Sequence, residues 1–414
     1  MYHPRPVLMK HVTKHFRLKR TLGFWGVSID GIGVIVGAGI YALIGVAAGV
    51  AGPALWMSFV FAGILALVTG LSYAELSSIF KTDAGEYDYL TKAFNKYLGI
   101  AVSALLVLAG VVICATVSLA FGGYFQTLIG VDARWIALGL LVLGTIIGIR
   151  GMTESTAIAA GLTIVSILGL LFIIILSIPH LGKVSLFEMP FGFSGVLQGS
   201  ALVFFAYIGF EAIIKLTEET KQPEKTIPRA IMFSIVVSTI LYILVALSAV
   251  SVLNWQEIST SKSPLADVAG TFFGSSAFLV VAIIALVSTA NTVIIEMIAI
   301  SRTLYGLAQR KVVPQLFGYV HPTRRTPVYA VIATGLGSIV FLKVGSLESL
   351  AHIANFFMFG TFALVNFSVI ALRWRIKKAR PFCVNCNVLG VPVLPMLGGL
   401  MSIGMLFIVM KELV

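Results

Sequence analysis

Long apolar runs, separated by short polar or basic connections, fill this chain from residue 27 onward. A helix of roughly 20 apolar residues crosses the hydrocarbon core of a bilayer, and here 58% of the residues are hydrophobic and only 11% are charged. Lipid offers no partner to backbone polar groups, so such runs must be helical. The pattern predicts an all-α polytopic membrane protein with eleven spanning helices, over residues 27–50, 53–78, 99–128, 134–151, 155–178, 195–216, 228–252, 275–301, 327–343, 346–372 and 392–412.

Lysine and arginine gather at one side of these predicted helices. If the N-terminus is cytoplasmic, the cytoplasmic segments hold 24 of the 29 basic residues, all except Arg134, Lys183, Lys262, Lys343 and Lys411. The positive-inside rule then predicts a multi-pass protein of the cell membrane with a cytoplasmic N-terminus and an extracellular C-terminus. The net charge of +12 lies mainly at helix ends, where anionic lipid attracts it, so we expect membrane lipid and no nucleic acid as a partner.

Two blocks of five helices divide the chain, over residues 27–178 and 195–372. The first block starts on the cytoplasmic side and the second on the outer side, so the blocks have the opposite orientations of a 5+5 inverted repeat. Residues 1–26 form a basic cytoplasmic tail. Residues 373–414 form a cytoplasmic loop and one extra helix.

Glycine-bearing interruptions occur in the first helix of each block. They are Val36-Gly37-Ala38-Gly39-Ile40-Tyr41 and Phe205-Ala206-Tyr207-Ile208-Gly209-Phe210-Glu211. A matched pair of interrupted helices indicates the binding site of a secondary transporter. The alternative is close helix packing, for which Gly33 and Gly37 are suitably spaced.

The two interruptions offer backbone groups of opposite polarity. One half-helix ends in free carbonyl groups and the next begins with free amides, which carry the positive end of the helix dipole. The amides suit a carboxylate and the carbonyls suit an ammonium. We therefore predict that an amino acid is bound by the amides of Gly37, Ala38, Gly39 and Ile40 and by the carbonyls of Ile35, Phe205, Ala206 and Ile208.

Few polar side chains lie within the predicted spans. Glu211 follows the second interruption and is a candidate for proton-linked function, or for a structural acceptor that pairs with Lys215. Ser288 and Thr289 are candidates for a sodium site, or bond back to their own helix. Glu75 lies towards a helix end and needs no special role. No cofactor is expected beyond a coupling H⁺ or Na⁺.

Three cysteines give no metal site. Cys114 lies within a span as a small core residue. Cys383 and Cys386 form a CxxC in a cytoplasmic loop, which supplies only two of the ligands that zinc needs. We interpret them as two unlinked thiols, with pairing to another subunit or a redox role as the alternative.

Several motifs resemble the amino acid–polyamine–organocation permeases. They are Gly31-Ile32-Gly33-Val34-Ile35-Val36-Gly37-Ala38-Gly39-Ile40-Tyr41, Ala84-Gly85-Glu86-Tyr87, Phe204-Phe205-Ala206-Tyr207-Ile208-Gly209-Phe210-Glu211, Glu218-Glu219, Pro223-Glu224-Lys225-Thr226-Ile227-Pro228-Arg229-Ala230 and Ser301-Arg302-Thr303-Leu304-Tyr305-Gly306. The resemblance implies the leucine-transporter fold, with the first and sixth helices broken, amino-acid substrates at the breaks and Phe205 as the outer gate. The chain departs from the family in having eleven rather than twelve predicted helices and in the loop Ala308-Gln309-Arg310-Lys311-Val312-Val313-Pro314, where ARDGxxP is common. It also has Ser166 where several proton-coupled members have a lysine.

We expect a secondary amino-acid transporter that works by alternating access. Apolar neighbours such as Phe205 and Ile208 favour neutral amino acids, with cationic amino acids or polyamines as alternatives. A transporter-like membrane sensor of amino acids is the alternative from another class. An enzyme is not expected, because no span holds a convergent nucleophile, base and metal set.

Overall fold

Helices make up nearly all of the structure, a computed structural model that describes residues 20–80, 85–151, 156–217, 219–375, 380–383, 387–388 and 391–413. The α-helices are α1 (Phe24–Ile35), α2 (Ala38–Ala51), α3 (Leu55–Ile79), α4 (Gly85–Ala93), α5 (Lys96–Ile129), α6 (Ala133–Arg150), α7 (Thr156–Ser177), α8 (Gly192–Val203), α9 (Pro223–Val252), α10 (Trp255–Thr260), α11 (Pro264–Gln309), α12 (Val328–Val344), α13 (Leu347–Arg375) and α14 (Val393–Leu413). Short 3₁₀ helices are η1 (Gly52–Ala54), η2 (Ile178–His180), η3 (Phe204–Tyr207), η4 (Phe210–Leu216) and η5 (Gln315–Gly318). The strands β1 (Asn387–Val388) and β2 (Val391–Pro392) form a small antiparallel pair.

Nine helical segments of the described residues are long and apolar enough to cross a bilayer. The first of them, Phe24–Ile79, covers two of the predicted spans, and the shorter apolar helix α12 matches the span predicted at 327–343. The all-helical, polytopic character is therefore confirmed, and the number of spans stays a prediction. The predicted basic tail lies outside the described residues as far as Lys19, and so does Cys386.

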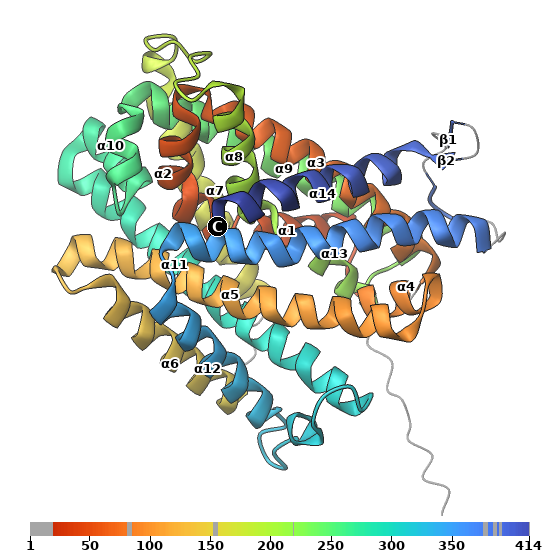
Figure 1. The fold of residues 1–414 in the computed structure, drawn as a ribbon. Helices are drawn as coiled ribbons and strands as arrows, with labels where there is room; N and C mark the ends of the chain where they lie inside the picture. The colour runs from red at the N-terminus through yellow and green to blue at the C-terminus, as the bar shows by residue number, and fades with distance from the viewer. Residues whose placement is uncertain are drawn as a thin grey trace, which may run out of the picture.

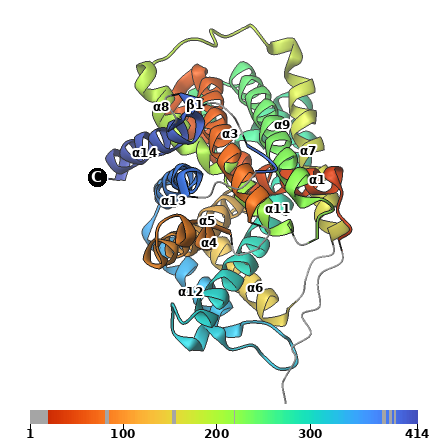
Figure 2. The ribbon, with the colours of Figure 1, turned by 90° about the vertical axis from the view of Figure 1, so that its right-hand side faces the viewer.

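The helices pack in three neighbouring groups (Figures 1 and 2). In one group, α3 lies along α9, α9 contacts α1, and α8 contacts α2 and α3. In the second, α5 packs against α6, α11 and α12. In the third, α13 and α14 lie along each other, and α13 also packs on α5. Since α2 touches α5 and α11 as well as α8, it lies where the first two groups meet.

Both predicted helix interruptions are present. α1 ends at Ile35 and α2 begins at Ala38, because Val36 has ψ 49° and Gly37 has ψ −135°. The second run is divided into α8, η3 and η4, and Gly209 between the last two has φ +123°, which residues with a side chain rarely adopt. A third irregularity, at Phe273 and Gly274, separates the first part of α11 from the rest, and the predicted span starts directly after it, at residue 275.

The predicted start of the seventh span is wrong by more than one turn. The sequence pattern puts Pro228 in the first turn, but α9 begins at Pro223 and Pro228 lies inside it. Proline fits the first position of a helix because its missing N–H has no intrahelical partner there. Pro223 takes that position, and Pro228 is buried, so packing holds the helix together where one backbone hydrogen bond is missing.

Candidate functional site

The two helix breaks are in direct contact. A Cβ atom placed on Gly39, in the first turn of α2, would lie 2.5 Å from the Cα atom of Ala206 in η3. Only glycine allows this approach of one backbone to another. The contact is deep in the protein, because Ala38, Ile40, Phe205 and Ala206 are each no more than 4% exposed. Two segments far apart in the sequence therefore lie side by side in the buried interior.

The amides predicted to bind a carboxylate open α2. Gly37 is the N-cap residue, and no side chain caps this end of the helix. The amides of Ala38, Gly39 and Ile40 belong to the first turn, where intrahelical acceptors are missing. A Cβ atom on Gly37 would lie 2.9 Å from the hydroxyl of Thr292 on α11, a neighbour that the sequence did not indicate.

Two of the four carbonyls predicted to bind an ammonium meet at one hydroxyl group. Tyr242 Oη on α9 lies 2.6 Å from the carbonyl oxygen of Ile35 and 3.0 Å from that of Ala206. The carbonyl of Phe205 instead accepts a 3.3 Å hydrogen bond from the amide of Ile208, the residue that links η3 to η4. Sequence reasoning missed Tyr242, although a tyrosine within an apolar span needs a partner for its hydroxyl, and that was the available signal.

A cavity of about 170 Å³ lies beside the first turns of α2. Tyr41 and Gly45 of α2 line it together with Tyr124 of α5 and Lys262 of the connection before α11. The Tyr124 hydroxyl donates a 3.2 Å hydrogen bond to the Tyr41 carbonyl. The cavity therefore begins one turn beyond the predicted amides, on the side of α2 that faces α5. Phe205, the predicted outer gate, is buried in η3.

Glu211 folds back onto the second break. Its carboxylate accepts a 2.9 Å hydrogen bond from the amide of Gly209. Lys215, the partner considered from the sequence, is exposed. The side chain thus acts locally as an acceptor for the break itself, and any change in its protonation would be felt at that backbone amide.

The remaining candidates surround the same region. Ser166 on α7 is buried, and its carbonyl accepts a 3.1 Å hydrogen bond from the hydroxyl of Tyr41. The position of the family's lysine therefore lies against α2 just after the break. Ser288 and Thr289 on α11 are also buried. The Thr289 hydroxyl donates to the Ala285 carbonyl of its own helix at 2.7 Å. This is the bond to its own helix that was considered as the alternative to a sodium site.

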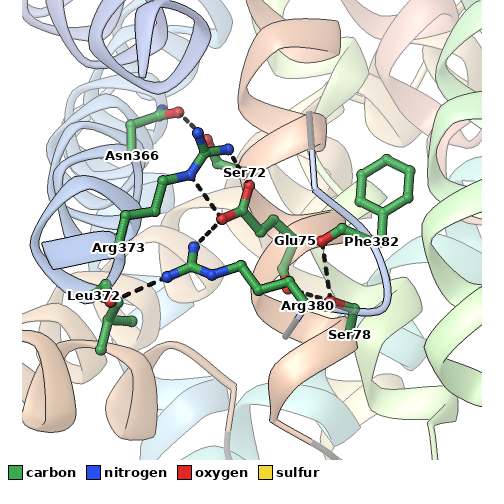
Figure 3. Close-up of polar contacts among 8 residues, drawn as sticks. All are labelled: Ser72, Glu75, Ser78, Asn366, Leu372, Arg373, Arg380 and Phe382. Atoms are coloured by element: carbon green, nitrogen blue, oxygen red, sulfur yellow. Dashed lines mark hydrogen bonds and ion pairs between the residues drawn. The ribbon is translucent and has the colours of Figure 1, made fainter. Parts of the chain in front are cut away.

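A separate ion cluster joins α3 to α13 and to the loop that follows it (Figure 3). Arg373 and Arg380 both pair with the carboxylate of Glu75, which is 2% exposed. Arg373 Nε donates to Glu75 Oε1 at 2.9 Å. The Ser78 hydroxyl donates to the carbonyl of Phe382 at 3.3 Å, which adds a second tie to the loop. Glu75 was expected to need no special role, although an acid within a span needs a partner, and that was the missed signal.

Cys383 lies beside this cluster. Burial raises the pKa of its thiol, and the charge of Glu75 raises it further, against a smaller lowering by Arg373 and Arg380. Within the described part of the chain, no three His, Cys, Asp or Glu side chains are grouped as a metal site would require.

These features define a class of protein. It is a polytopic helical membrane protein in which two broken helices bring free backbone amides and carbonyls to one buried place. Residues 22–412 match the amino acid permease family, and the chain belongs to that family. The predicted resemblance is thereby confirmed, and the chain is a transporter rather than an enzyme.

Curated relatives agree with this family. The chain is 29% identical to the branched-chain amino acid permease BcaP of Bacillus subtilis (strain 168), over 95% of this chain and 88% of the relative. It is also 29% identical to the methylthioribose transporter of the same organism, over 93% and 87% of the two chains. It is 29% identical to the chloroplastic cationic amino acid transporter 9 of Arabidopsis thaliana, over 88% and 68%.

Proposed function

We propose that this protein is a secondary amino-acid transporter that works by alternating access and holds its substrate by main-chain groups at the two helix breaks. The observation that carries the proposal is the contact of the breaks, which brings the uncapped N-terminus of α2 beside the carbonyls of Ile35 and Ala206. Backbone dipoles of both signs meet there, so a substrate with two charges needs no oppositely charged side chain as its partner. An α-carboxylate and an α-ammonium fit these two ends.

A transport cycle has a direction, so the cytoplasmic and extracellular ends of the protein have to be assigned. We assign the N-terminus to the cytoplasm and the C-terminus to the extracellular side, in a protein of the cell membrane. The 5+5 inverted repeat of the leucine-transporter fold accounts for the two breaks at equivalent places. Large apolar side chains exposed on α7, such as Leu168 and Ile175, suit contact with lipid.

Neutral amino acids are the proposed substrates. Apolar side chains of Phe205 and Ile208 adjoin the breaks, and one relative is named as a branched-chain amino acid permease. Cationic amino acids are the second candidate, because several relatives are named as cationic amino acid transporters. A simple polyamine has no carboxylate for the amides of α2 and is disfavoured.

Coupling to a proton is proposed through Glu211, which contacts the second break. Ser166 replaces the lysine that the family resemblance associates with proton coupling, so Glu211 is the first candidate carrier. Sodium is the alternative coupling ion, with Ser288 and Thr289 as its candidate ligands. Loss of sodium-dependent binding in Ser288→Ala or Thr289→Ala would favour that alternative.

Counterflow in proteoliposomes tests the proposed function. Vesicles that contain the purified protein and are loaded with an unlabelled neutral amino acid should take up the labelled one faster than unloaded vesicles. Binding of the same amino acid without any flux would instead identify a membrane sensor. Absence of both binding and flux across a panel of amino acids would contradict the proposal.

A further inference from the structure

Tyr242 is the one side chain that touches both helix breaks in the described part of the chain through hydrogen bonds to carbonyls that they leave free. Its ring is fully buried and packs edge-on against Tyr207, with centroids 5.3 Å apart, and at a tilt against Phe59, with centroids 5.6 Å apart. The hydroxyl group lies between the ends of α1 and η3.

One hydroxyl proton cannot satisfy two carbonyl acceptors. The carbonyls of Ile35 and Ala206 both lie at C-terminal ends, where helix dipoles are negative, so their common partner should be a cation with several donors. An ammonium has three N–H donors and a positive charge. The hydroxyl of Tyr242 is therefore a weaker partner that occupies the same place.

We propose that Tyr242 is a positioning residue that occupies the ammonium subsite of the empty transporter and is displaced by the α-ammonium of the substrate. The proposal rests on the proposed function. It adds what holds the two half-helices together when no substrate is bound. Without substrate, the hydroxyl bridges the two half-helices and is a shared, incomplete partner for their two buried carbonyls. When the substrate leaves, the hydroxyl takes its place again, which assists release.

Removal of the hydroxyl group tests this role. Tyr242→Phe keeps the ring and its contacts but leaves the two carbonyls unpaired in the empty state. The variant should bind a neutral amino acid about three- to tenfold more tightly, the change expected from one hydrogen bond, and should exchange it more slowly. The α-hydroxy acid with the same side chain lacks the ammonium, and should compete equally weakly with wild type and variant.

Tyr73→Phe is the matched control. The Tyr73 hydroxyl on α3 donates to Glu86 Oε1 at 3.1 Å and bonds to neither break, so this variant should keep the affinity and exchange rate of the wild type. Weaker amino-acid binding in Tyr242→Phe would make the hydroxyl a direct ligand and overturn the displacement proposal. Unchanged binding would overturn it as well. Failure of the wild type itself to bind amino acids is a different result, because it contradicts the proposed function.

A second measurement follows Tyr242 in the wild-type protein. With 3-fluorotyrosine incorporated throughout and resonances assigned by single substitutions, the ¹⁹F signal of Tyr242 should shift when the amino acid is added. The signal of Tyr73 should shift less, and the α-hydroxy acid should move neither. A stationary Tyr242 signal at saturating amino acid would overturn the proposal.

Discussion

Gly39 and Ala206 are in backbone contact across the two helix breaks, so close that a Cβ atom on Gly39 would lie 2.5 Å from the Cα atom of Ala206. This contact makes one site of two segments from different halves of the chain. It also makes the site sensitive to a single methyl group, because the atoms that would have to move belong to the backbone of η3.

Gly39→Ala should abolish substrate binding. The added methyl group separates η3 from α2, so the amides and carbonyls no longer face a common ligand. Affinity for the amino acid, measured by scintillation proximity on purified protein, should fall by more than about tenfold. Gly404→Ala is the control, since nothing lies within 4 Å of a Cβ atom at that position in α14. Wild-type affinity in a well-folded Gly39→Ala variant would contradict the predicted site.

Glu75→Gln should destabilise the protein without changing the substrate site. The change leaves two arginines beside a neutral amide in a buried place, and breaking such a pair costs about 3 kcal/mol. Thermal unfolding in detergent measures the loss. Asp88→Asn is the control, because the pair between Asp88 and Arg310 spans 3.8 Å and is partly exposed, so it contributes less than about 1 kcal/mol. Equal unfolding temperatures for the two variants would contradict the importance of the cluster.

Alkylation of Cys383 should require a higher pH than alkylation of an ordinary cysteine. Burial and Glu75 raise the pKa of its thiol, so the reactive thiolate forms only at higher pH than in a free cysteine. In a Cys386→Ser background, the rate of modification followed by peptide mass spectrometry should reach half its maximum at a higher pH than for a free cysteine. Glu75→Gln should move the profile to lower pH, since it removes a negative charge beside the two arginines. A midpoint below the ordinary range would contradict the observed surroundings of Cys383.

Glu211→Gln tests the proposed proton coupling. The substitution keeps the acceptor oxygen that faces the Gly209 amide but removes titration. Transport in proteoliposomes should lose most of its pH dependence, while exchange of internal for external amino acid continues because the backbone groups remain. If the pH profile of the variant matches that of the wild type, Glu211 is not the proton carrier.

The helices and their interruptions were predictable because their causes are local. An apolar run must be helical in lipid, and Gly37 and Gly209 mark the places where the helix stops. The contacts that complete the site were not predictable in this way. Tyr242 meets Ile35 only because α9 lies against α1. The position of Gly39 against Ala206 is equally a result of packing between the two halves of the chain.

The ion cluster near the C-terminal end of α3 illustrates the same limit. Glu75 and Arg373 each look like a charged residue at a helix end, and Arg380 looks like part of a basic loop. Their pairing depends on how α13 crosses α3 and on the path of the chain after Arg375, which no periodicity encodes. The start of α9 was misjudged for a local reason, because two prolines compete for the first turn and only packing decides between them.

Competition by substrate analogues tests the main-chain site most directly. The measurement is displacement of a labelled neutral amino acid from the purified protein by its methyl ester, its N-acetyl derivative and the unmodified compound. The account predicts that each modified compound competes far more weakly, because it leaves either the α2 amides or the carbonyls of Ile35 and Ala206 without their charged partner. Equal competition by the ester or the N-acetyl derivative, or tight binding of a polyamine without a carboxylate, would contradict it.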